Sequence, residues 1–321
     1  MLLADFAQRK ADGVVVRRRG RLVEEAFANY QRNQAMKKLI LLVLLSASFI
    51  AARVNGQTFT YSNDFPNDMI GTASRPESAG KIEIESADDF LIKSNPTRIT
   101  GATFTGLVPA GATINDVRVE IYRVFPNDSN TARTPNVVTR LNSPSDVAFA
   151  DRSSNDGNLS FTTSVLSANF TALNSVLNGI NPSPTQTTGG EGSVTGQEVR
   201  FTVNFTTPFK LPADHYFFIP QVELAGSTDN FFWLSSERPI VSGTPFVPDL
   251  QSWIRNANLD PDWSRIGMDI VGGNPAPTFN ASFSLTGTVP DTGSTAALFG
   301  SGVVVLIWLK RRAAWNNSHT A

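Results

Sequence analysis

Short runs in which apolar and polar residues alternate dominate the chain between Gln57 and Thr288. Val199–Phe205 (VRFTVNF) alternates without error, which predicts a strand with one buried face. Val117–Ile121 (VRVEI) repeats the pattern. Further strands are predicted at 81–85, 99–104, 158–163, 215–222, 231–234 and 281–285. About eight to ten such strands indicate an all-β fold, with a single jelly-roll-like β-sandwich as the predicted form.

One segment has helical spacing instead. Leu166, Phe170, Leu173 and Leu177 recur at intervals of four, three and four residues, and Gly179 stands where a helix C-cap belongs. The pattern predicts one short helix over Ser167–Asn178, lying across a sheet end.

The N-terminal part contains an apolar run, Leu39–Ala52, directly after Met36-Lys37-Lys38. Positive residues before a short apolar stretch, with small residues beyond it, are typical of a secretory signal peptide. We therefore assign 36–56 to a signal helix that is cut between Gly56 and Gln57, with a cut after Ala52 as the alternative.

Residues 1–35 precede this complete signal. Two interpretations are open: translation starts at Met36, or residues 1–35 form a disordered basic tail on the cytoplasmic side, as the positive-inside bias favours.

The C-terminal part has three consecutive features. Val289-Pro290-Asp291-Thr292-Gly293 comes first, then the apolar run 296–309, then Lys310-Arg311-Arg312. The basic triplet would stop transfer and hold the C-terminus in the cytoplasm, so the apolar helix would span the membrane before any processing. Proline and glycine keep the five-residue motif extended and accessible. Residues 313–321 form a further tail.

These three features together resemble the C-terminal sorting signals of bacterial exported proteins. Val289–Gly293 is similar to the VPDSG variant of the PEP-CTERM type, with Thr292 in place of Ser. The resemblance implies removal of the tail by an exosortase-like enzyme and delivery to the envelope or an extracellular polysaccharide matrix. The motif is also similar to the LPxTG sortase signal, in which the cut falls between Thr292 and Gly293.

The body between these signals is predicted to be one β-sandwich domain, 57–288, followed by the sorting signal 289–312. Its segments 122–126, 139–146 and 249–255 resemble an uncharacterised domain of exported bacterial proteins with such tails, for which the resemblance implies no activity.

Charge is divided between body and ends. Residues 57–290 hold 14 Lys and Arg against 23 Asp and Glu, while the ends hold 13 against 5. An acidic body lacks the basic surface that neutralises phosphates, which argues against nucleic acid as a partner. The chain has no cysteine, which excludes disulfides, thiolate zinc sites and cysteine nucleophiles.

Few residues could carry catalysis. His215 is the only body histidine, no G-x-S-x-G motif occurs, and the nitrogen and sulfur ligands of a zinc hydrolase are lacking. We interpret His215 as a hydrogen-bonded structural residue at a strand entrance. A glycosidase needs only two carboxyl groups across a cleft, for which three pairs are candidates: Asp88 with Asp89, Asp260 with Asp262, and Glu191 with Glu198.

Two kinds of binding site are candidates. Asp260 and Asp262 lie in an oxygen-rich turn that could bind calcium, the only cofactor suggested, although Asx turns explain such a turn equally well. Trp253 and Trp263 lie beside polar residues and could stack on sugar rings if exposed, or pack in the core.

The sequence thus predicts an exported, surface-sorted bacterial protein without catalytic activity. Its partners would be the processing enzyme and, in the matrix, polysaccharide. A carbohydrate-binding adhesion module is the alternative, and a glycoside hydrolase is a further one.

Overall fold

The computed structural model describes residues 24–38 and 57–290, apart from 64, 79, 95, 133–140, 181–186, 227 and 238–248. The chain divides into two compact units, Gly56–Pro290 and the pair of ends Met1–Asn55 with Asp291–Ala321. In the second of these, residues 24–38 form a helix with mostly exposed side chains, so this stretch is helical rather than disordered.

Several predicted segments lie outside the described residues. These are the apolar part of the signal peptide with Gly56, most of the sorting motif, the apolar run 296–309, the basic stop 310–312 and the tail 313–321. Among the described residues, no helix combines the length and apolar character needed to cross a membrane.

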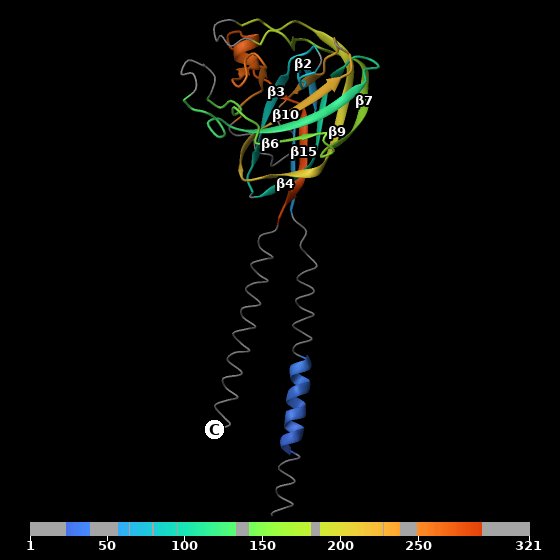
Figure 1. The fold of residues 1–321 in the computed structure, drawn as a ribbon, viewed down its shortest axis with the longest axis vertical. Coiled ribbons are helices and arrows are strands. Elements are labelled where there is room, and N and C mark those ends of the chain that lie inside the picture. The colour runs from blue at the N-terminus through green and yellow to red at the C-terminus, as the bar shows by residue number, and fades with distance from the viewer. Residues whose placement is uncertain are drawn as a thin grey trace, which may run out of the picture. The chain divides into compact units, whose positions relative to one another are not determined.

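The body is mostly β and forms two sheets (Figure 1). Fifteen strands and one π-helical turn, η1, follow one another in this order: β1 Gln57–Ser62, β2 Pro66–Ala73, β3 Ile84–Ile92, β4 Thr97–Val108, β5 Ile114–Arg123, β6 Ala150–Ser153, β7 Ser160–Ala172, β8 Ser175–Val176, β9 Val194–Leu211, β10 Asp214–Leu224, β11 Phe232–Ser236, β12 Trp253–Asn256, β13 Ser264–Arg265, η1 Ile266–Val271, β14 Asn280–Ala281 and β15 Phe283–Val289.

The larger sheet has nine strands, with the path β1-β15-β4-β11-β2-β8. In addition, β9 pairs with β4, β7 pairs with β9, and β14 pairs with β11. The smaller sheet has six strands in the order β13-β12-β3-β10-β5-β6. Consecutive strands often lie in different sheets, so most pairings join segments far apart in the sequence.

In β9, where apolar and polar residues alternate most regularly, the apolar side chains lie in the core as predicted. In β9, Phe201, Val203 and Phe205 are buried, while Thr202 and Asn204 are exposed. Side chains of a strand point alternately to its two faces, so one face of β9 contributes to the core.

Aromatic rings from both sheets meet in that core. Phe218 of β10 stacks on Phe283 of β15, with ring centroids 4.9 Å apart. Phe104 of β4 stacks on Phe201 of β9 at 4.7 Å, and Phe231 meets both edge-on. The main hydrophobic cluster therefore lies between the two sheets, where large rings fill the space efficiently.

The helix predicted over Ser167–Asn178 is wrong. Residues 160–172 form β7, which pairs with β9 through two register shifts. Leu166 and Leu173 are 44% and 60% exposed, so the apolar spacing does not mark a buried helical stripe. Serine, threonine and asparagine dominate the segment and disfavour a helix interior, and β9 supplies the hydrogen-bonding partner that a strand needs.

The exposure of Leu173 can be tested by substitution. Replacing Leu173 by alanine is expected to change the free energy of unfolding by less than ~0.5 kcal/mol, because its side chain is exposed. The matched control is Leu107→Ala, which truncates a buried leucine and should cost about 2–5 kcal/mol. Equal losses in urea denaturation would show that Leu173 is buried, as the predicted helix would require.

The smaller sheet is buried on its outer face as well. Alternate residues of β3 point to opposite sides: Phe90 packs in the core between the sheets, while Ala87 packs in a second cluster with Tyr122, Phe217 and Trp253. This outer cluster also includes Leu250 and Trp263, which flank β12 in the chain, so the segments 249–252 and 257–263 cover this face of the sheet. It is beneath this cover that charged side chains gather.

Candidate functional site

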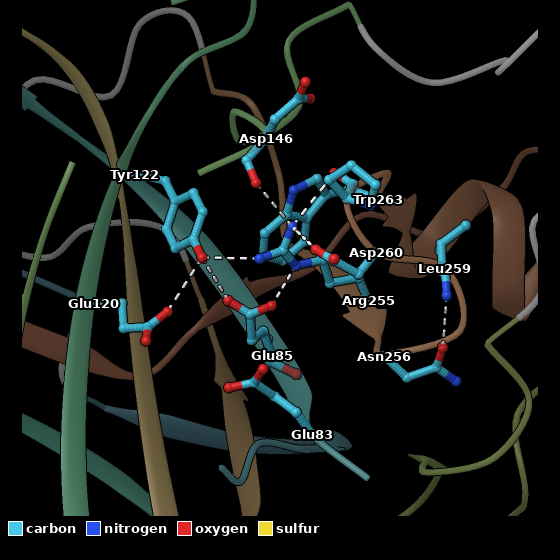
Figure 2. A network of polar contacts seen from close by, with 12 residues as sticks. Glu83, Glu85, Glu120, Tyr122, Asp146, Arg255, Asn256, Leu259, Asp260 and Trp263 are labelled. Atoms are coloured by element: carbon cyan, nitrogen blue, oxygen red, sulfur yellow. Dashed lines mark hydrogen bonds and ion pairs between the residues drawn. The ribbon is translucent and has the colours of Figure 1, made fainter. Parts of the chain in front are cut away.

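A cluster of carboxyl groups, a tyrosine and an arginine lies on the outer face of the smaller sheet (Figure 2). Glu85 comes from β3, Glu120 and Tyr122 from β5, and Arg255 from β12. Strand pairing places these residues on one face, since Arg255 is opposite Glu85 and both Glu120 and Tyr122 point the same way along β5. We refer to these four residues as the Glu–Tyr–Arg cluster.

Its hydrogen bonds converge on the Tyr122 hydroxyl group (Figure 2). That hydroxyl lies 2.9 Å from Oε1 of Glu85 and 3.2 Å from Oε2 of Glu120. Nη2 of Arg255 donates to it at 2.8 Å, and Nε of Arg255 pairs with Glu85. Since a tyrosine hydroxyl has one proton, it can donate to only one of the two carboxylates at a time.

Protonation of Glu120 resolves this shortage of protons. Burial, followed by the negative charge of Glu85 and a hydrogen bond to it, raises the pKa of Glu120 to about 8. A protonated Glu120 donates its own hydrogen bond, while Tyr122 donates to Glu85. Burial and the charge of Glu85 also raise the pKa of the neighbouring Glu83, which accepts a hydrogen bond from Gln221.

Arg255 ties the cluster to the covering segment. Its guanidinium lies 4.4 Å from the centre of the Trp263 ring, and its Nη1 pairs with Oδ1 of Asp260 at 2.7 Å. The residue is only 5% exposed. Since Arg255 belongs to β12 and contacts Asp260 and Trp263, it fixes the covering segment 257–263 onto the sheet.

The two candidate glycan-binding tryptophans lie in the interior. Trp253 and Trp263 are 1% and 2% exposed. Their Nε1 atoms donate to the carbonyl oxygens of Leu250 at 2.8 Å and Ser145 at 3.1 Å. Of the two possibilities that the sequence left open for these rings, the structure shows core packing, because both fill the outer cluster of the smaller sheet.

The calcium candidates also have protein partners. Asp260 pairs with Arg255, and Asp262 has an interaction within the chain as well. Across the described parts of 24–290, no group of three or more His, Cys, Asp or Glu side chains is arranged to hold a metal ion. Calcium binding by Asp260 and Asp262 stays a prediction.

Asp88 and Asp89 are consecutive in β3 and point to opposite faces, so this pair does not face a shared site. Asp88 accepts hydrogen bonds from Ser252 and from the backbone of Ala281, and burial raises its pKa. Glu191 accepts three backbone N–H groups, those of residues 177–179, at 2.6–2.7 Å, which commits its carboxylate to that turn.

His215 lies at the start of β10, and its Nε2 is 2.6 Å from Oδ2 of Asp89. The other oxygen of Asp89 accepts the backbone N–H of Leu250. The pair joins β3, β10 and the covering segment 249–252, which agrees with the predicted hydrogen-bonded histidine at a strand entrance.

The Glu–Tyr–Arg cluster brings four ionisable side chains together in the protein interior. Glu85 and Glu120 share the Tyr122 hydroxyl and are 3% and 8% exposed. The cluster is suited to holding strands together.

Sequence reasoning did not single out these four residues. The segments 81–85 and 117–121 predict strands, but the pattern does not show which residues their charged side chains meet. Only the sheet order brings them within reach of Arg255.

Comparison with curated proteins and solved structures gives little information about this chain. No curated protein matches the chain. A solved structure of the cysteine protease and lectin-like domains of Cwp84, a surface layer associated protein of Clostridium difficile, aligns at 11% identity with a TM-score of 0.28. The alignment covers 64% of this chain and 32% of that chain.

Comparison with protein-family models gives a specific match, which begins at the end of β15. The model of the VPDSG-CTERM motif matches residues 288–313. This range contains Val289–Gly293, the apolar run and the basic stop, in the order that the sequence analysis described. The chain therefore carries a VPDSG-CTERM motif, a PEP-CTERM-type C-terminal sorting signal that indicates an exported, surface-sorted protein.

Proposed function

We propose that this chain is a non-catalytic protein of the bacterial envelope or extracellular polysaccharide matrix, released from its membrane-anchored precursor by an exosortase-like enzyme. The observation that carries the proposal is the sorting motif at 288–313, which begins where the β body ends. We take the body, with its two packed sheets, to be a jelly-roll-like sandwich.

The burial of ionisable groups supports the non-catalytic part of the proposal. Glu85, Glu120, Tyr122, Arg255 and Asp88 are buried and bonded to internal partners. Glu191 and Asp260 are exposed but are paired with backbone N–H groups and with Arg255. A catalytic carboxyl group must instead reach substrate from a cleft. The alternative of carbohydrate binding loses the residues that suggested it, since Trp253 and Trp263 are buried.

Mass spectrometry of the protein from the producing bacterium tests the proposal. We expect a mature chain that begins at Gln57 and ends within 289–293. Replacing Asp291 by alanine should abolish tail removal, because the processing enzyme recognises the motif by its side chains. The control is Thr286→Ala, an exposed residue of β15 outside the motif, which should be processed normally. Recovery of the complete chain from the cytosol would overturn the proposal.

A further inference from the structure

The strand β7 lies at one end of the larger sheet, beside β9 (Figure 1). Within the described parts of the body, β9 is its strand partner, so the edge of β7 that faces away from β9 is open. In an antiparallel pair, every second residue directs its N–H and C=O groups away from the partner strand. The open edge therefore presents main-chain donors and acceptors that a further strand can bind.

The regular part of this edge is Ser160–Val165. This stretch pairs with β9 without a register shift, whereas two shifts follow between Val165 and Phe170. Such bulges bend the second half of the strand and protect it from pairing. Further on, the chain approaches β2, where the N–H of Leu173 donates to the carbonyl oxygen of Asp68. A straight partner strand thus has access to Ser160–Val165.

The composition of β7 does not protect this edge. Exposed edge strands are normally kept apart by charged residues, by proline or by very short length. Ser160–Ala172 extends over 13 residues and contains neither a charged residue nor proline. By contrast, β6 at the end of the smaller sheet has only four residues, of which Asp151 and Arg152 are charged.

Apolar side chains are also exposed along β7. Val165 and Leu166 are 56% and 44% exposed. Val165 is in register with the buried Val199, and Thr163 is in register with the buried Phe201. Register partners point to the same face, so the core-facing side of the larger sheet continues onto β7 and is solvent-exposed there. A strand added beside β7 would cover Val165.

The other uncharged end strand differs in this respect. β1 contains no charged residue, but its apolar side chains Phe59 and Tyr61 are half-buried and buried. Exposed apolar surface and an open, uncharged edge therefore coincide at β7.

Charge favours a second copy of this chain as the added strand. The body holds 14 Lys and Arg against 23 Asp and Glu, so two copies repel each other over much of their surface. The uncharged β7 avoids this repulsion and offers a charged partner no attraction. Two identical strands that pair antiparallel about a two-fold axis are self-complementary. With the axis at Thr163, Phe161 of each copy lies opposite Val165 of the other, an aromatic and β-branched pair of the kind that stabilises sheets.

We infer that two copies of this chain join through Ser160–Val165 of β7, antiparallel about a two-fold axis at Thr163, so that their larger sheets form one continuous sheet. The inference goes beyond the proposed function, because it concerns the β body alone and holds whether or not the tail is removed.

Cysteine cross-linking in the producing bacterium tests this pairing, because the full chain contains no cysteine of its own. Thr163→Cys places one thiol from each copy at the axis, so mild oxidation should join most chains into a disulfide-linked dimer on a non-reducing gel. The matched control is Thr202→Cys, an exposed residue of β9 on the opposite face of the sheet, which should stay monomeric. Absence of the Thr163→Cys dimer, or equal dimer in both variants, would overturn the inference.

A charge placed on the edge should weaken the pairing. Adding Val165→Lys to Thr163→Cys should reduce the cross-linked fraction roughly tenfold, which corresponds to ~1.4 kcal/mol, because each lysine replaces the partner of Phe161. Thr60→Lys, at an exposed position of β1, is the control and should leave cross-linking unchanged. Equal cross-linking with and without Val165→Lys would contradict the inference.

Light scattering of the wild-type mature protein, recovered from the producing bacterium, tests the association without any substitution. The mass should be about twice that of one chain, and Val165→Lys should shift it toward the mass of one chain. A wild-type protein with the mass of one chain would overturn the inference and leave the proposed function standing.

Discussion

Replacing Arg255 by methionine is expected to lower the free energy of unfolding by about 3–5 kcal/mol. Arg255 and Glu85 are both almost completely buried, and the arginine also donates to Tyr122 and pairs with Asp260. Without Arg255, the Glu85 carboxylate stays buried next to Glu83 and Glu120 and has lost the guanidinium group that pairs with it. Loss of one member of a buried ion pair is costly for this reason, although the intact pair itself need not stabilise strongly.

Urea denaturation monitored by tryptophan fluorescence measures this effect, because Trp263 lies against the arginine. The matched control is Arg98→Met, which removes an exposed arginine of β4 and should change stability by less than ~0.5 kcal/mol. The double variant Arg255→Met with Glu85→Gln should recover part of the loss, since the uncompensated charge is gone. A cost below ~1 kcal/mol for Arg255→Met would show that the cluster does not fix the covering segment.

Raising the pH is expected to destabilise the protein through Glu120. The folded protein holds this carboxyl group protonated, because its pKa is raised from 4.5 to about 8. Between those two values the folded state binds more protons than the unfolded state, so the contribution of Glu120 is fully present below pH ~4.5 and is lost as the pH rises through about 8. The slope is at most ~1.4 kcal/mol per pH unit.

Glu120→Gln isolates this contribution, because the amide remains neutral at every pH. The variant should match the wild type near pH 4.5 and become the more stable protein by several kcal/mol above pH 8. The groups that face Glu120 are Glu83, Glu85, Tyr122 and Arg118, whose Nη1 lies 3.8 Å away. The pKa values of Glu83 and Asp88 are also raised, so the difference between variant and wild type, rather than the wild-type curve, is the measurement.

The exposed Glu77→Gln serves as its control, and its difference from the wild type should not vary over the same range. A flat difference for Glu120→Gln would mean that Glu120 is ionised in the folded protein.

Taken by itself, the sequence determined the features that depend on local pattern. Regular alternation in 117–121 and 199–205 identified strands, because a strand with one buried face imposes that period on its side chains. The sorting signal was identified in the same way, since its motif, apolar run and basic stop are read along the chain.

The local sequence pattern was not sufficient where contacts between distant segments determined the structure. The apolar spacing of Leu166 to Leu177 is helical, yet the chain up to Ala172 is extended because β9 offers a partner strand, and Leu166 and Leu173 stay exposed. Trp253 and Trp263 have polar neighbours in sequence but apolar neighbours in space.

The tertiary structure alone decided which charges meet and which ends lie together. Glu85, Glu120 and Arg255 are separated by 35 to 170 residues, and only the order β12-β3-β10-β5 brings them into contact. The pairing of Gln57 with Val289 likewise joins opposite ends of the body. Such contacts depend on the choice of strand partners, and that choice is made by the packing of the whole core rather than by any one segment.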